Sequence, residues 1–275
     1  MPIGIMQGRM VPPSDGRFQC FPRQRWADEF EFCAQAGISA IEWIYDLHGA
    51  DVNPIASDAG ISAMQQLSAR YKVAVRSVCA DYFMDLPLVR VDGVELSQRI
   101  EVLRWLMQRC QALPIQRIVL PFVDASAIED EADIDRVVAV LDTLGDTMQN
   151  SGIELHLETA LGPVQFAALL ERVRHPMVKV NYDSGNSASL GYAPREEFAA
   201  YGLRVGSVHI KDRVRGGGTV ALGSGDADFD GLFASMVAVQ YSGDIVLQVA
   251  RGEPGDEVAW TRANCTFVNQ RWPRT

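Results

Sequence analysis

Short apolar runs alternate with amphipathic stretches along nearly the whole sequence, and this alternation constrains the fold more than any other feature. Eight runs are typical of buried strands: 3–6, 40–44, 72–79, 115–122, 153–158, 177–182, 205–210 and 244–248. Each is followed by a helical pattern, expected over 24–36, 57–70, 93–113, 133–149, 164–174, 195–201, 228–239 and 256–269. A strand that is followed by a crossover helix leads to a parallel strand, so the alternation predicts a parallel sheet.

The number of units predicts how this sheet closes. Eight strand-and-helix units in 275 residues fit one closed barrel, which typically takes about 250 residues. We therefore predict an α/β fold, a single (β/α)8 TIM barrel that forms one domain over residues 1–275. An open dinucleotide-binding sheet is the main alternative, but residues 5–10 carry a single glycine where its fingerprint needs three.

Charge and composition argue against several functional classes. The formal net charge is −10, whereas binding to nucleic acid or to anionic membranes depends on clustered Lys and Arg. The N-terminus lacks a signal-peptide pattern, and no window of the sequence is apolar enough for a membrane span. Five scattered cysteines without a CxxC pair are typical of reduced thiols. We therefore expect a cytoplasmic protein with a small-molecule partner, and leave homo-oligomerisation open.

Four of the predicted strands end in a residue that can bind a metal ion. Glu158, Asp183 and His209 end three consecutive strands, and Gln248 ends the last one. Parallel strands of a barrel bring their carboxyl ends to one face, so these four side chains are expected to converge. Taken alone, each carboxylate is as readily explained as a solvated or salt-bridged loop residue.

Convergence of these side chains would have an electrostatic cost. Two carboxylates that are buried together need a compensating cation or proton. A metal ion held by Glu158, Asp183, His209 and Gln248 would supply that charge. Oxygen and imidazole ligands without thiolate suit Mn²⁺, Mg²⁺, Co²⁺ or Zn²⁺ in an open site that water or substrate completes. The sequence thus predicts a divalent metal ion as cofactor.

The strand ends lie in motifs that carry a resemblance. The motifs are LET at 157–159, NYDSGN at 181–186, VHIKDR at 208–213, LGSGD at 222–226 and IEW at 41–43. Their order and spacing resemble the xylose-isomerase-like TIM barrel superfamily. The chain is most similar to its sugar phosphate isomerase/epimerase branch, which includes the ketose 3-epimerases and is related to endonuclease IV. The resemblance extends over nearly the whole chain.

The resemblance implies roles for individual residues. The ligand glutamate, aspartate and histidine of the family fall on Glu158, Asp183 and His209, and its substrate-binding arginine falls on Arg215. In the epimerases two ligand glutamates also serve as acid/base groups on opposite faces of the sugar, while the metal polarises the carbonyl and stabilises an enediolate. The second glutamate falls on Gln248, which can still bind metal but cannot take up a proton at useful pH.

This departure bears on the mechanism. Epimerisation by two bases would need a replacement for the missing carboxylate, and Glu253 or Glu42 are the candidates. A single base suffices to move a proton between adjacent carbons. We therefore take Glu158 as the principal base, with aldose–ketose isomerisation or an elimination as the outcome.

Two basic residues near His209 have a functional and a structural interpretation. Lys211 is a candidate to bind a substrate oxygen or phosphate, or else forms a salt bridge with Asp212. Arg215 precedes three glycines, which suits an anion clamp on a mobile loop as well as a plain surface loop.

Several other strand-end residues are candidates for the pocket. Gln7 and Arg9 follow the first strand and could reach the substrate, and Glu42 is a further candidate for substrate binding. Cys79 and Asp81, after the third strand, are candidates to line the pocket, although a thiol nucleophile would have no evident histidine partner.

Taken together, these features predict a metal-dependent isomerase or epimerase of a small sugar, sugar phosphate or polyol that works through an enediolate. A dehydratase of the inosose or dehydroshikimate type on the same metal site is the first alternative. A non-catalytic sugar-binding barrel, with Gln248 as the mark of lost activity, is the second. A DNA-repair endonuclease fits poorly, because that branch uses several zinc ions and many histidines and this acidic chain has four.

Overall fold

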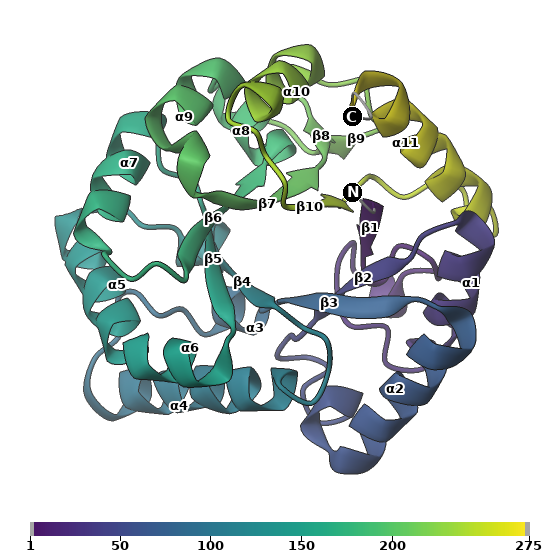
Figure 1. The fold of residues 1–275 in the computed structure, drawn as a ribbon, viewed down its shortest axis with the longest axis horizontal. Helices are drawn as coiled ribbons and strands as arrows, with labels where there is room; N and C mark the ends of the chain where they lie inside the picture. Colours follow the sequence, from purple (N-terminus) through teal and green to yellow (C-terminus); the bar gives the residue numbers. More distant parts are fainter. Residues whose placement is uncertain (1–2, 273–275) are drawn as a thin grey trace.

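The computed structural model describes residues 3–272, and within them eight parallel strands close into a barrel (Figure 1). The strand order around the barrel is β1-β10-β7-β6-β5-β4-β3-β2. The strands are β1 (Ile3–Met6), β2 (Ala40–Ile44), β3 (Ala74–Cys79), β4 (Arg117–Phe122), β5 (Glu154–Thr159), β6 (Val178–Asp183), β7 (Val205–Ile210) and β10 (Asp244–Leu247). The predicted (β/α)8 TIM barrel is therefore confirmed.

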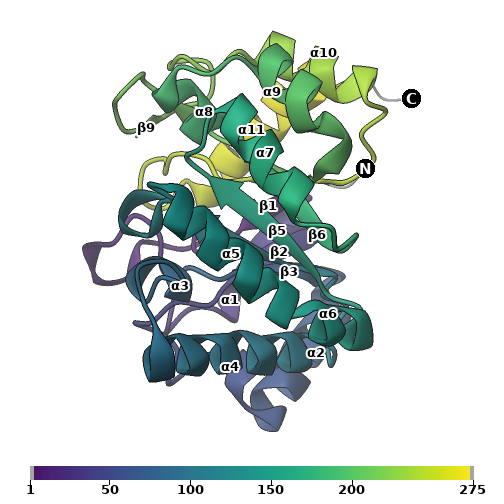
Figure 2. The ribbon, with the colours of Figure 1, turned by 90° about the vertical axis from the view of Figure 1, so that its left-hand side faces the viewer.

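Helices surround the barrel on the outside, as Figures 1 and 2 show. The outer elements that follow the strands are α1 (Asp28–Ala36), α2 (Asp58–Tyr71), α4 (Gly93–Cys110), α5 (Glu131–Thr143), α6 (Gly145–Ser151), α7 (Pro163–Arg172), α9 (Pro194–Tyr201), α10 (Phe229–Ala238) and α11 (Glu257–Arg271). No helix within residues 3–272 has both the length and the apolar character that a membrane crossing requires.

The helix expected over 133–149 is two helices in the structure. Helix α5 ends at Thr143 and α6 begins at Gly145, with buried Leu144 at the joint. Glycine is a poor helix former, and the periodic pattern on either side does not reveal the break. The amphipathic pattern thus located the helical region but not its interruption.

Several short elements in the loops were not expected from the sequence. They are α3 (Tyr82–Asp85), α8 (Ser184–Leu190), the hairpin of β8 (Asp212–Arg213) and β9 (Thr219–Val220), and the 3-10 turns η1 (Ser14–Gly16), η2 (Pro54–Ala56), η3 (Asp124–Ser126) and η4 (Gly202–Arg204). Helix α8 consists mainly of small and polar residues, so it lacks apolar periodicity. Its start is fixed by Asp183, whose Oδ1 accepts hydrogen bonds from the backbone N–H groups of Gly185 and Asn186 at 2.8 Å.

The packing between β2 and the outer layer is centred on the fully buried Trp43. Phe21, Trp26 and Phe30 pack around its ring with centroid distances of 5.8 to 6.1 Å. The indole Nε1–H donates to Asn53 Oδ1 at 2.9 Å. A buried indole N–H needs such an acceptor, so the loop after β2 is held to this strand by a polar contact as well as by apolar packing.

Asn53 also closes the end of β2. Its amide donates to the backbone oxygen of Ile44 at 2.9 Å, and the residue is 2% exposed. The Asn53→Ala substitution would leave the Trp43 donor and the Ile44 acceptor unsatisfied inside the protein. We expect a loss of about 2–4 kcal/mol in the free energy of unfolding, since each unsatisfied buried group costs about 1–3 kcal/mol. Urea unfolding followed by tryptophan fluorescence measures it.

The exposed Asn150 gives a matched control. The same change to alanine at this position is expected to alter the unfolding free energy by at most about 0.5 kcal/mol. Equal effects of the two substitutions would contradict the role of Asn53.

Candidate metal centre and substrate cavity

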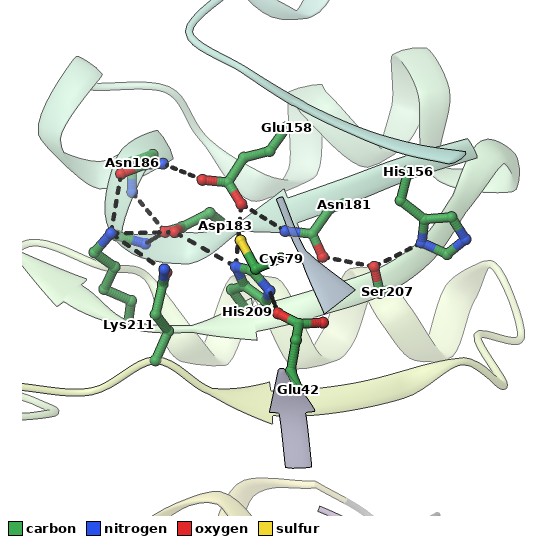
Figure 3. A network of polar contacts seen from close by, with 12 residues as sticks. Glu42, Cys79, His156, Glu158, Asn181, Asp183, Asn186, Ser207, His209 and Lys211 are labelled. Carbon is green, nitrogen blue, oxygen red and sulfur yellow. Dashed lines mark hydrogen bonds and ion pairs between the residues drawn. The ribbon is translucent and has the colours of Figure 1, made fainter. Parts of the chain in front are cut away.

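Three of the four predicted ligands come together at the carboxyl ends of adjacent strands. Glu158 lies at the end of β5, Asp183 ends β6, and His209 is opposite Asp183 in the register of β7. One ligand atom of each residue lies within 4.8 Å of the others, and all three residues are buried (Figure 3). The expected convergence of these strand ends is therefore present in the structure.

The two ring nitrogens of His209 have different surroundings. Nε2 lies 2.5 Å from Glu42 Oε1, on the side away from the cluster. Nδ1 lies 3.1 Å from Glu158 Oε2 and 4.0 Å from Asp183 Oδ2. Nδ1 is buried and forms no hydrogen bond with any part of the chain that the structure describes. The nearest acceptor is the Glu158 carboxylate, so either a proton on Nδ1 or a metal ion between the two groups would satisfy them.

This donor set fits a divalent metal ion. It combines an imidazole nitrogen with carboxylate oxygens from Glu158 and Asp183, as in open metal sites without thiolate ligands. The carboxylate of Glu42 would accept the Nε2–H of His209 and so leave the lone pair on Nδ1 for the metal. A carboxylate behind a ligating histidine is the usual arrangement in metal sites.

The buried charges of the cluster depend on one another. Burial alone raises the pKa of Glu42, but the charge of His209, its hydrogen bond and Arg117 together lower that pKa to about 2. Burial alone lowers the pKa of His209, but Glu42 and Glu158 together raise it to about 10. The carboxylates therefore require positive charge at the position of this ring, and either a proton or a metal ion can supply it.

Lys211 extends the cluster towards the fourth predicted ligand. Its Nζ lies 3.3 Å from Asp183 Oδ2, 3.4 Å from Asn186 Oδ1 and 3.4 Å from Gln248 Oε1. Gly185 leaves room for this side chain, because a Cβ there would lie 2.6 Å from Lys211 Cγ. Gln248 thus points its amide oxygen towards the cluster.

The alternative pairing of Lys211 with Asp212 is wrong. The buried Asp212 carboxylate accepts backbone N–H hydrogen bonds from Gly223, Gly225 and Ala227 instead. It therefore shapes the loop after β9, and Lys211 remains available to the cavity.

Hydrogen bonds hold the Glu158 carboxylate in one orientation. Asn181 donates to Oε2 at 2.7 Å, and Asn186 donates to Oε1 at 2.8 Å. Asn181 Oδ1 in turn accepts from Ser207, whose hydroxyl lies 2.7 Å from His156 Nδ1 (Figure 3). This chain of contacts fixes which end of the Asn181 amide faces Glu158, and with it the direction of the carboxylate.

A cavity of about 370 Å³ adjoins the cluster. Its polar wall includes Glu158, Asn186, Lys211, Arg213 and Gln248. Its apolar wall includes Phe18, Met84, Pro121, Val123 and Leu190. This volume and this mixture of apolar surface with a few polar groups are typical of small-molecule sites.

Arg215, the predicted substrate-binding arginine, does not line this cavity. It is exposed, and its guanidinium packs against Gly191, where a Cβ would meet it at 2.7 Å. Arg213 lines the cavity instead and donates to Asn186 Oδ1 at 3.0 Å. The chain enters the β8–β9 hairpin directly after β7, so the arginine at the start of the hairpin faces the site.

Gln7 and Arg9 are buried but do not line the cavity. Gln7 Oε1 accepts the backbone N–H of Ile44 at 2.9 Å. The Arg9 guanidinium donates to the backbone oxygen of Phe18 at 3.2 Å and to Gln19 Oε1 at 2.9 Å. Arg9 thus holds the loop that carries Phe18 and Gln19, two residues that do line the cavity.

The two expected replacements for a second base do not line the cavity either. Glu42 is 1% exposed and lies behind His209, and Glu253 is exposed in the loop after β10. Asp81, directly after β3, does line it, as does Gln19. Its place after a strand end made Asp81 a candidate from the sequence, whereas nothing in the sequence distinguishes Gln19.

Comparison with known proteins identifies the type of barrel. Residues 30–270 match the family model described as xylose isomerase-like TIM barrel. Among solved structures, the IolI protein with a binding zinc atom superimposes with a TM-score of 0.78, 18% identity and 100% coverage of both chains. A search of curated protein sequences returns no match.

Two sugar epimerases are also similar in structure. The D-allulose 3-epimerase from Methylomonas sp. in complex with D-allulose has a TM-score of 0.75 and 18% identity, with 99% of this chain and 97% of that chain covered. The D-psicose 3-epimerase from Clostridium cellulolyticum H10 with D-tagatose has a TM-score of 0.77 and 15% identity, with both chains covered completely. At these identities the likeness shows a shared fold.

The contact between His209 and Glu42 gives a prediction for metal affinity. Glu42→Gln weakens the acceptor that faces His209 Nε2 without touching Glu158 or Asp183. We expect the affinity for Mn²⁺ or Zn²⁺ to fall by roughly 10–100-fold, the usual effect of losing such an outer carboxylate. Isothermal titration of the purified protein with each metal salt measures it.

Glu154→Gln is the matched control, because Glu154 also faces a histidine ring, at 2.9 Å from His156 Nε2, but belongs to the start of β5. The control should bind metal as the parent protein does. An unchanged affinity in Glu42→Gln would contradict the role given to this carboxylate.

Proposed function

The chain belongs to the xylose isomerase-like TIM barrel family, and on that basis we propose that it is a metal-dependent isomerase or epimerase of a small sugar, sugar phosphate or polyol. One observation is the main support for this proposal. The buried His209 Nδ1, without a hydrogen-bond partner in residues 3–272, faces two carboxylates beside a cavity of small-molecule size.

Glu158, Asp183 and His209 would hold the metal ion, with Gln248 Oε1 as a further oxygen ligand. A bound divalent ion would polarise the substrate carbonyl and stabilise the negative charge that develops on its oxygen. Zn²⁺, Mn²⁺, Co²⁺ and Mg²⁺ all suit these ligands. The zinc in the IolI structure makes Zn²⁺ the first ion to test.

Glu158 is the principal base in this proposal. Its carboxylate lines the cavity, and the two asparagine amides hold it in one direction. It would remove a proton from the carbon next to the substrate carbonyl, so that the C–H electron pair forms the double bond of an enediolate. Lys211 and Arg213 would bind substrate oxygens or a phosphate, since both line the same cavity.

The similar structures suggest which sugars to test, and the free thiols bear on the cellular location. The two similar epimerases contain D-allulose and D-tagatose, so these ketohexoses are the first sugars to test. A cytoplasmic location agrees with the free thiols of Cys33, Cys79, Cys110 and Cys265. A homo-oligomer remains a prediction from the sequence.

Metal content and proton exchange test the proposed function together. The metal-loaded, desalted protein should retain about one ion per chain, and Asp183→Ala should lose it. In D₂O the loaded enzyme should introduce deuterium next to the carbonyl of D-allulose or D-tagatose, measured by NMR. Glu158→Gln should lower that rate by roughly 10²–10⁴-fold for the sugar whose C–H bond faces this carboxylate, because it removes the positioned base.

The exposed Glu171 on α7 provides the control, since Glu171→Gln removes the same charge far from the cavity lining. It should retain the parent rate. Exchange in Glu158→Gln within about threefold of the parent rate with both sugars would reject Glu158 as the base.

A further inference from the structure

A second buried carboxyl group lines the cavity. Asp81 follows β3, is 9% exposed and belongs to the same lining as Glu158. In the barrel, β4 separates β3 from β5, so the two carboxyl groups approach the cavity from different strands. Asp124 also lines the cavity but is exposed, so among the described residues Asp81 and Glu158 are the buried carboxyl groups of this lining.

Two hydrogen bonds fix the Asp81 side chain. Gln19 Nε2 donates to Asp81 Oδ2 at 2.8 Å, and the Cys79 thiol donates to Oδ1 at 3.1 Å. Burial and the charges of Asp81, Glu42 and Glu158 raise the pKa of Cys79 well above its usual range, so the thiol stays protonated and remains a donor. One amide and one thiol donor thus hold the two oxygens of the Asp81 carboxyl group.

The orientation of the Gln19 amide depends on Gln248. Gln248 Nε2 donates to Gln19 Oε1 at 3.1 Å, and Arg9 Nη2 donates to the same oxygen at 2.9 Å. With its oxygen occupied in this way, Gln19 turns its NH₂ group towards Asp81. A glutamate at position 248 could not donate this hydrogen bond at neutral pH. The carboxamide that breaks the ligand pattern thus helps to orient another carboxyl group.

Asp81 is in a suitable state for proton transfer. Burial is the largest influence on its pKa and raises it. The hydrogen bonds from Gln19 and Cys79 lower the pKa, and the charges of Asp46 and Glu158 raise it, so that the resulting pKa is about 6. An acid or base is most effective when its pKa lies near the working pH. Both protonation states of Asp81 are therefore accessible near neutral pH, unlike those of an ordinary aspartate.

We propose that Asp81 is a second acid/base group of this site, which exchanges a proton with the sugar from a different side than Glu158. The proposal rests on the proposed function and makes it more specific. The proposed reaction is then an epimerisation, because two groups on different walls of the cavity can reach opposite faces of one carbon.

Both carboxyl groups take part in the proposed proton transfer. The Glu158 carboxylate takes the proton from the carbon next to the carbonyl, and the C–H pair forms the enediolate. The Asp81 carboxylic acid then donates its proton to the same carbon from the other face, and the enediolate electrons restore the carbonyl. Glu158 is left protonated and Asp81 ionised. Proton exchange of both groups with water, or turnover in the reverse direction, restores the starting state.

Deuterium exchange separates the two half-reactions. With one of the two epimers of a ketose such as D-allulose as substrate in D₂O, Asp81→Asn should still introduce deuterium into the recovered substrate through Glu158. The formation of the other epimer should fall by about 10²-fold or more. With the other epimer as substrate the pattern should reverse. Asp81→Asn should then lose exchange, and Glu158→Gln should retain it.

This mirror-image pattern is not expected from a structural role of Asp81, which would lower exchange from both epimers equally. Asp85→Asn is the control, because Asp85 lies at the other end of α3, is exposed and is outside the cavity lining. It should behave as the parent enzyme.

The outcomes distinguish the two proposals. Epimerisation by Asp81→Asn within about threefold of the parent rate would overturn the assignment of Asp81 and leave the metal-dependent function intact. An equal loss of exchange from both epimers would also overturn it. Absence of exchange by the metal-loaded parent with both sugars would reject the proposed function, and the assignment of Asp81 with it.

Discussion

The site depends on the burial of an imidazole ring among carboxylates. His209 is fully buried, with Glu42 on one nitrogen and Glu158 and Asp183 on the side of the other. Carboxylates at this depth need compensating positive charge, to which Arg117 and Lys211 also contribute. The parallel register of β5, β6 and β7 brings the groups together, so the barrel itself creates the need for a cation. A proton or a divalent ion can supply that charge, and the proposed metal ion would leave the cavity beside it free for a substrate.

The surrounding polar contacts orient the groups of this cluster. Asn181 and Asn186 direct the Glu158 carboxylate, and the contacts among His156, Ser207 and Asn181 determine which end of the Asn181 amide faces it. Beside Asp81, both Arg9 and Gln248 donate to the Gln19 amide oxygen and so orient that amide. Amide side chains are useful here because they add no charge, while their donor and acceptor ends distinguish two neighbours. Both carboxyl groups of the cavity are thus held by neutral donors.

The sequence predicted the barrel and the clustering of three candidate ligands because both follow from regular structure. Strand ends of a parallel barrel meet at one face, so Glu158, Asp183 and His209 could be placed from their positions in strands alone. Cavity residues that lie on loops could not be placed from strand positions. Arg213 rather than Arg215 lines the cavity because the β8–β9 hairpin starts directly after β7, and no apolar periodicity marks so short a hairpin. Gln19 reaches the cavity through a loop whose course depends on Arg9, a contact that is not local in sequence.

Charge also explains why a carboxamide suits position 248. Glu42, Asp81, Glu158 and Asp183 already place four buried carboxyl groups around the cluster and its cavity, with Lys211 and Arg213 as the nearby cations of the lining. A glutamate at 248 would add a fifth carboxylate, which would raise the pKa of its neighbours and attract the Lys211 ammonium away from Asp183 and Asn186. The carboxamide keeps an oxygen towards the cluster and gives a donor to Gln19. In the proposed mechanism, the carboxamide at 248 would thus account both for the absence of a base at this position and for the placement of Asp81.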